Sequence, residues 1–362
     1  MMNQIRFPNK RLAHRLAALV LAAGFTMAIE CPSHACAFHT YIPSKTLVDQ
    51  IIEAEVLVLA RQAPDDPFRF TPFETIRHRV EPPPIPDLVD TATRRRLSDE
   101  PNHAVLFAYD ADSDGWIRVT YVDEVMRPVV DHIVELAPRW STGGDDERVR
   151  FAAALLGQKN QALRRLALTE LDRAPYSMLR KVGVPIGAEA LLNDLWRFQE
   201  IPYLPIRALL LGLTGNDAAR AVIRTAVERA AHVRSSSNLG PWATALIEID
   251  GSSGVAMLQA LFLRDATQPA KARELVVEAL AVHNISAEPQ LRGAIGLALS
   301  DFLRRDPASA VMIARQFGSR NDWTQAERLK EALNGGAVEK GPDLDVVTSY
   351  LAQARRTRAD VR

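Results

Sequence analysis

Residues 145–333 constrain the fold most, because they read as about ten short amphipathic helices with almost no strand-like segment between them. Two segments, 160–173 and 270–283, carry apolar residues at the spacing that places them on one helix face. These residues are Leu163, Leu166, Ala167 and Leu171 in the first segment, and Ala272, Leu275, Val276, Ala279 and Leu280 in the second. Charged residues such as Asp172 and Glu278 are expected mostly off these apolar faces. The pattern predicts a stacked helical body.

Helix breakers and caps divide this stretch into its helices. Asn216, Ser252 and Asp306 stand at expected N-caps, because their side-chain oxygens can accept from the first N–H groups of a helix. Eight prolines fall near expected helix starts, where the missing N–H weakens a helix least. They are Pro175, Pro185, Pro202, Pro205, Pro241, Pro269, Pro289 and Pro307.

Internal similarity within the helical stretch is weak. Three times, near Gly157, Gly212 and Gly251, a short helix ends near a glycine and a second helix follows at unequal spacing. With these helix pairs and the sequence Leu163-Arg164-Arg165-Leu166-Ala167-Leu168, about half the chain resembles α-solenoids of the HEAT type, including the HEAT-like repeats of phycobilin-lyase relatives. The resemblance implies a curved array that offers a concave surface to a protein partner. A tetratricopeptide-like array and an irregular helical bundle are the alternatives.

The first 35 residues have the composition of a secretory signal peptide. Four basic residues precede an apolar run of fourteen residues, Leu16 to Ile29, which is shorter than the roughly 20 residues that span a bilayer. Small residues predict cleavage after Ala35 or Ala37. The mature chain is therefore expected to be exported, either to the periplasm or to the outside of the cell, with no transmembrane segment.

The balance of charges argues against nucleic acid as a partner. The 362 residues hold 44 basic and 44 acidic residues, and residues 1–35 contribute four basic residues and one acidic residue. The mature chain is thus left with 40 basic and 43 acidic residues, without the concentrated basic surface that nucleic acids require. The expected partner is another envelope or secreted protein.

From Phe38 to about Trp140 the periodicity changes to that of β-strands. Residues 55–60 read as a buried apolar strand, and residues 68–76 alternate apolar and polar residues, the period-two pattern of a half-buried strand. Four strands are expected, at 55–60, 68–76, 104–109 and 116–122, with a hairpin between the last two. Short strands at this density predict a small barrel or a compact sheet. Their order, after a cysteine near the start of the exported chain, resembles the netrin-like, OB-type domains of tissue metalloprotease inhibitors. This resemblance implies an inhibitor of an exported protease as one hypothesis.

Two places in this region have metal-ligand spacing. Asp110, Asp112 and Asp114 precede Gly115 like the first half of a calcium loop, in which alternate carboxylates converge on one hard cation. A polar hairpin turn without metal is the alternative interpretation. Cys36 and His39 form a possible chelating pair at the mature amino terminus, although zinc needs three or four ligands. Calcium is the one cofactor considered, and a metal-binding protein or metal-dependent hydrolase follows as the second hypothesis.

The sequence therefore predicts an α+β chain that is mainly α. We expect a signal peptide at 1–35, a β-rich domain at 36–142, a helical-repeat domain at 143–340 and a C-terminal helix with a basic tail at 341–362. No catalytic motif stands out, so the leading hypothesis is an exported, non-enzymatic scaffold that binds protein. Aromatic residues on the helices are the candidate partner contacts, if they prove exposed. They are Trp196, Tyr203, Trp242 and Trp323.

Overall fold

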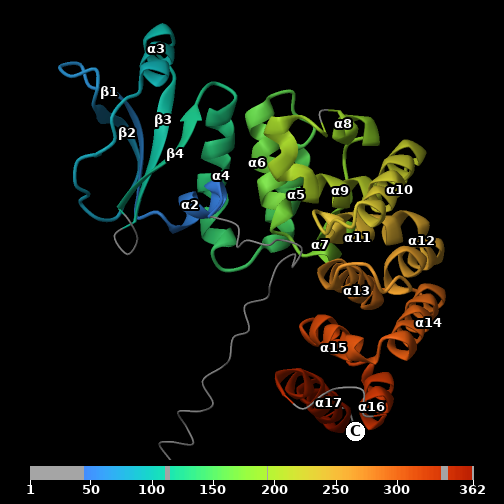
Figure 1. Cartoon of the computed structure of the whole chain (residues 1–362). Coiled ribbons are helices and arrows are strands. Elements are labelled where there is room, and N and C mark those ends of the chain that lie inside the picture. The colour runs from blue at the N-terminus through green and yellow to red at the C-terminus, as the bar shows by residue number, and fades with distance from the viewer. Residues whose placement is uncertain (1–44, 111–114, 194, 336–340, 361–362) are drawn as a thin grey trace, which may run out of the picture. The chain divides into compact units, whose positions relative to one another are not determined.

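The computed structural model describes residues 45–110, 115–193, 195–335 and 341–360, all within one compact unit, Cys36–Arg362. A small sheet with three helices comes first, and every later regular element in the described residues is helical (Figure 1). The fold is therefore α+β and mainly α, as predicted. The first elements are α2 (Leu47–Glu53), β1 (Val56–Gln62), β2 (Phe70–His78), α3 (Thr91–Asp99), β3 (Ala104–Asp110), β4 (Gly115–Val122) and α4 (Met126–Trp140).

The four predicted strands are confirmed and form one antiparallel sheet in the order β2-β1-β3-β4. Strands β3 and β4 pair as the predicted hairpin, with Asp110 opposite Gly115. A small barrel and a compact sheet were both expected. The described strands form an open sheet, because the edge strands β2 and β4 do not pair with each other. Pro72 lies in β2, where the missing N–H is tolerated because the strand is an edge.

The two faces of the sheet belong to different cores. Leu57 of β1 and Leu106 of β3 join α2 and α4 in the main core, which continues without a break into the later helices. Val58 and Phe107, one residue further along each strand, point to a smaller core closed by Leu97 of α3. Both faces of β1 and β3 are thus covered, so these two strands read as continuous apolar runs.

The remaining helices form a series in which neighbours pack on one another. From α9 onward one row runs α9, α11, α13, α15 and α17, while α12, α14 and α16 make the second row. The series comprises α5 (Asp145–Leu155), α6 (Gln161–Asp172), α7 (Tyr176–Val182), α8 (Ala188–Leu192), η1 (Phe198–Tyr203), α9 (Leu204–Leu213), α10 (Asp217–His232), α11 (Leu239–Asp250), α12 (Ser252–Leu258), η2 (Gln259–Leu263), α13 (Ala270–Asn284), α14 (Pro289–Arg305), η3 (Pro307–Ser309), α15 (Ala310–Gly318), α16 (Ala326–Asn334) and α17 (Pro342–Asp360). No helix among the described residues is long and apolar enough to span a membrane.

Glycine permits one of the closest contacts between these helices. Gly212 of α9 faces Ala245 of α11, and a Cβ atom at position 212 would lie 2.7 Å from the Cα of Ala245. Any larger residue there would force the two backbones apart. Asn216, predicted as an N-cap, caps α10 by accepting from Ala218 N and Ala219 N.

The predicted apolar faces of α6 and α13 are buried, and two charged residues predicted to lie off these faces are buried as well. Asp172 at the end of α6 and Glu278 in the middle of α13 are both buried. Helix α13 contacts α11, α14 and α15, so other helices cover most of its circumference rather than one face only. A pattern that assumes one covered face therefore misplaces the charges of a helix in the middle of a row.

A buried charged network, which we call the seam, ties α2 to the helical series. Its members are Thr46, Asp49, Arg148, Glu170 and Arg173. Arg148 of α5 lies 2.8 Å from an Asp49 oxygen and 2.6 Å from a Glu170 oxygen, and it donates to Thr46 Oγ1 at 3.1 Å. Arg173 pairs with the other oxygen of Asp49. The helix that precedes the sheet is thereby fixed to α5 and α6.

Candidate functional site

A fixed turn between α15 and α16 positions Trp323. Asn321 adopts the left-handed conformation (φ 54°), which asparagine tolerates better than most residues, and Asp322 N donates to Phe317 O at 3.0 Å to end α15. The buried carboxylate of Asp322 then accepts from the backbone N–H and the hydroxyl of Thr324 at 3.0 and 2.6 Å. The short sequence Asn-Asp-Trp-Thr thus folds locally into a turn that presents Trp323.

Helix α17 holds this turn in place from the opposite side. The Tyr350 hydroxyl donates to Asp322 O at 2.7 Å and accepts from Gln325 N at 3.2 Å. Burial raises the pKa of Tyr350, so its hydroxyl stays protonated and able to donate. The rings of Tyr350 and Trp323 lie 5.0 Å apart. Trp323 is therefore held before any partner arrives.

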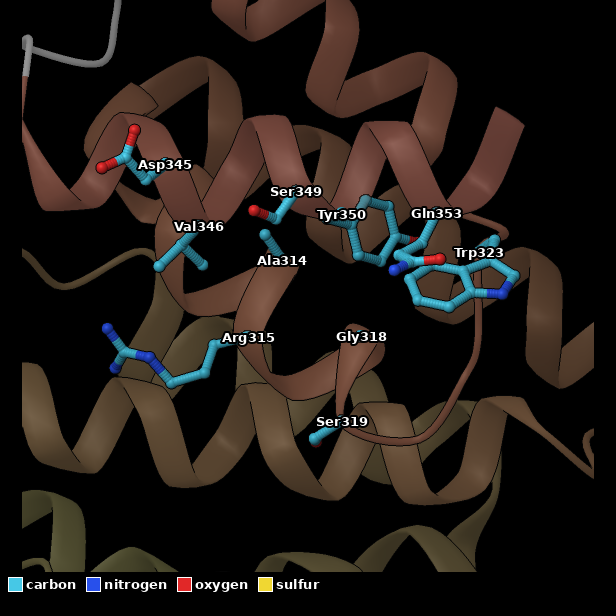
Figure 2. A pocket seen from close by; sticks show the side chains of 10 residues that line it. All are labelled: Ala314, Arg315, Gly318, Ser319, Trp323, Asp345, Val346, Ser349, Tyr350 and Gln353. Carbon is cyan, nitrogen blue, oxygen red and sulfur yellow. The ribbon is translucent and has the colours of Figure 1, made fainter. Parts of the chain in front are cut away.

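On one side of Trp323 lies a hollow of about 420 Å³, the apolar hollow, between α15 and α17. Figure 2 shows side chains of α17, among them Val346 and Tyr350, across from Arg315 of α15, with Trp323 at one end. Gly318 leaves space open in the hollow, because a Cβ atom at this position would lie 3.2 Å from the Tyr350 ring. Most of the exposed lining is carbon, so the hollow suits an apolar side chain.

On the other side of Trp323 lies a hollow of about 510 Å³, the basic hollow. Arg292, Arg320 and Arg358 line it, against one aspartate, Asp322. Arg320 pairs with Glu278 at 2.9 Å, and the exposed Arg358 pairs with Glu327 at 2.8 Å. The residues that line this hollow are Asn284, Ile285, Arg292, Arg320, Asn321, Asp322, Trp323, Thr324 and Arg358.

The charges of the basic hollow are unevenly compensated. Arg292 donates to Ala287 O at 3.0 Å and forms no ion pair with a carboxylate among the described residues. The charge of Asp322 is already held by neutral donors, including Asn284 Nδ2 at 2.6 Å. Burial raises the pKa of Glu278 more than its partner Arg320 lowers it. The hollow therefore favours an anionic group.

Asn284 adds an acceptor to this wall. Its side chain is 2% exposed, and its Nδ2 donates to Asp322 and Thr324. Within the described part of the chain its Oδ1 accepts no hydrogen bond. A buried amide with an unsatisfied acceptor is destabilising unless a donor completes it. Because this oxygen is buried, the arginine donors alone define what the hollow prefers, and they match a carboxylate.

The predicted aromatic residues fall into two separate groups. Trp242 is buried, and the exposed ring of Trp196 stacks on it at 6.2 Å between centroids. Tyr203, at the end of η1, is partly buried, as is Trp323. Phe198 and Ile201 are exposed near Trp196, at 87% and 48%, so these three residues form a second apolar surface, the Trp196 surface.

The predicted metal ligands are only partly described. Asp110 ends β3, and one of its oxygens lies 4.0 Å from Lys45 Nζ. Asp112, Asp114, Cys36 and His39 lie outside the described residues, so a calcium loop and an N-terminal chelating pair remain predictions.

The sequence did not reveal the polar residues around Trp323. Asn284, Arg292, Tyr350 and Arg358 come from three different helices or their ends, and no local pattern connects them. The one local signal is Asn321-Asp322, a pair of residues that favours turns.

No family model, curated protein or solved structure matches this chain.

Proposed function

We propose that this chain is an exported, non-enzymatic scaffold that binds a segment of another envelope or secreted protein around Trp323. The observation that carries the proposal is the position of Trp323 between an apolar hollow and a basic hollow. The export signal and the HEAT-like helix pairs in the sequence are consistent with a scaffold of this kind.

The two hollows define the chemistry of the segment that would bind. An aliphatic or aromatic side chain fits the apolar hollow, and a carboxylate one or two residues away reaches the arginines of the basic hollow. Trp323 would be the central contact, since tryptophan flanked by arginine is typical of the residues that dominate binding energies.

Preorganisation supports the same site. Tyr350 fixes both ends of the Trp323 turn by hydrogen bonds, so binding need not order the turn. Contacts that are rigid before binding lose less conformational entropy on association. We therefore expect a short acidic and apolar segment to bind without rearrangement of α15 or α17.

The test is a selection of displayed random dodecapeptides on the purified chain, followed by affinity measurements with the enriched peptides. We expect enriched peptides to carry Asp or Glu within two residues of a large apolar residue. Trp323→Ala should weaken their binding at least about tenfold, because central tryptophans contribute about 2 kcal/mol or more. Rising salt should weaken binding as well, since the arginines are partly exposed.

Trp196→Ala is the matched control, since it also removes an indole that packs on an aromatic ring. We expect it to leave the affinity of the enriched peptides unchanged. Peptides that bind Trp323→Ala as tightly as the unaltered chain would disprove the site. If Trp196→Ala abolished their binding instead, the Trp196 surface would be the docking site.

A further inference from the structure

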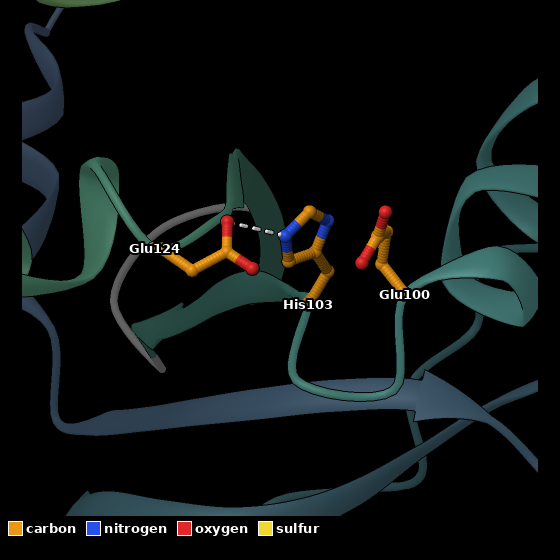
Figure 3. Close-up of side chains that lie close together, drawn as sticks. All are labelled: Glu100, His103 and Glu124. Atoms are coloured by element: carbon orange, nitrogen blue, oxygen red, sulfur yellow. Dashed lines mark hydrogen bonds and ion pairs between the residues drawn. The ribbon is translucent and has the colours of Figure 1, made fainter.

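We infer a second site, independent of the Trp323 region, that binds a divalent transition metal such as zinc through Glu100, His103 and Glu124. One ligand atom of each residue lies within 4.8 Å of those of the other two, the only such group among the described residues. Glu100 and His103 lie in the turn between α3 and β3, and Glu124 follows β4. Figure 3 shows the two carboxylates on either side of the imidazole.

The turn that carries two of these ligands is fixed from outside the group. His103 N donates to Glu100 O at 3.1 Å, which places both side chains on the same side of the turn. Arg61 of β1 donates through Nη1 to the carbonyls of Glu100 and Pro101, at 3.2 and 2.6 Å, and also to that of His103. The positions of Glu100 and His103 are therefore set by the sheet.

The imidazole is held by a hydrogen bond at one ring nitrogen and an ion pair at the other. His103 Nδ1 lies 2.9 Å from the hydroxyl of Tyr121, and the guanidinium of Arg96 lies 3.7 Å from the centre of the Tyr121 ring. His103 Nε2 consequently points toward Glu124, 2.7 Å from its Oε2. Histidine ligands typically bind metal through one ring nitrogen while the other is held by a hydrogen bond of this kind.

The ligand set identifies the class of metal. One imidazole and two carboxylates suit zinc or a similar transition metal, with water at a fourth position, whereas calcium and magnesium prefer oxygen ligands alone. Tetrahedral ligands at about 2.1 Å from zinc lie about 3.4 Å apart, so Glu124 must withdraw slightly from His103 and Glu100 must move closer to admit the ion. The side chain of Glu124 is 64% exposed and has room to move.

The test is a titration of the untagged full chain with Co²⁺, followed by visible absorption, and with Zn²⁺, followed by calorimetry. We expect one site whose affinity falls at least about 100-fold in Glu124→Gln, an exposed substitution that should leave folding intact, and in His103→Ala. Tyr121→Phe, which removes only the hydrogen bond to Nδ1, should weaken binding about tenfold.

His132→Ala is the matched control, because His132 also faces a glutamate, Glu135 at 3.7 Å, outside the group. It should bind both metals as the unaltered chain does. Equal affinity in the unaltered chain and Glu124→Gln would show that the three residues form only an ion pair and a neighbouring acid. Metal binding lost only on removal of Cys36 or Asp112 would likewise overturn the assignment.

Discussion

The seam and the basic hollow are both built from arginine side chains and carboxylates, but in the seam the carboxylates are buried, whereas in the basic hollow two of the three arginines are exposed. In the seam, Arg148 is 19% exposed, and it lies between Asp49 and Glu170, which are 10% and 3% exposed. In the basic hollow, Arg358 is 62% exposed, and Arg292 has no carboxylate partner among the described residues. Buried charges that pair with one another within the chain hold elements together. Charges that stay accessible and incompletely paired are available to a ligand.

The largest effect that tests this contrast is expected at the seam. Arg148→Met removes one cation and leaves Asp49 and Glu170 with less compensation in a buried setting. Breaking a buried ion pair from one side typically costs about 3–5 kcal/mol, so the free energy of unfolding should fall by that amount. Urea unfolding followed by circular dichroism measures it.

Arg315→Met provides the comparison, because Arg315 also pairs with a glutamate at 2.7 Å but is 50% exposed. Exposed pairs typically contribute less than about 1 kcal/mol. If the two variants lost equal stability, the seam would contribute no more to the free energy of unfolding than a surface ion pair does.

Much of the fold follows from local patterns in the sequence. The four strands and the apolar faces of α6 and α13 were predicted because apolar runs, alternation and helical spacing are properties of a few neighbouring residues. The burial of Glu278 could not be predicted in this way, because it results from how many helices surround α13. Helix α3 was not among the predicted elements, since its sequence is largely polar.

The candidate site was predicted only through Trp323 itself. Whether a tryptophan is a packing residue or a binding residue depends on tertiary contacts, as the buried Trp242 and the exposed Trp196 show. The contribution of Tyr350 depends on α17 lying against the Trp323 turn. Arg61 fixes the turn of Glu100 and His103, and the pairing of β3 with β4 brings Glu124 next to that turn.

An effect of intermediate size is expected from Asp172, which directly precedes the seam residue Arg173. Burial raises the pKa of Asp172 to about 7, from an ordinary value of 3.8. The folded chain therefore retains a proton between about pH 4 and pH 7 that the unfolded chain has lost. This contribution to stability is complete below about pH 4 and is lost as the pH rises through 7.

Asp172→Asn removes this titration, so the variant should gain stability relative to the unaltered chain as the pH rises from 4 to 8. The shift of about 3 pH units corresponds to about 2–4 kcal/mol across that range. Unfolding in urea at several pH values measures the difference between the two chains. A difference that does not change with pH would show that burial does not raise the pKa of Asp172.

The smallest effect on stability, and the sharpest test of the contrast, is expected from Arg358→Gln. Arg358 and Glu327 are 62% and 63% exposed, so loss of their ion pair should change the free energy of unfolding by less than about 0.5 kcal/mol. The same substitution removes a cation from the basic hollow, so the selected acidic peptides should bind about threefold more weakly at low salt. Lys330→Gln is a control that removes a nearby cation not lining the hollow. Equal losses of affinity in both variants would show that the peptides respond to the overall charge of the protein. The exposed arginines of the hollow would then bind the peptides no more specifically than other basic residues on the surface.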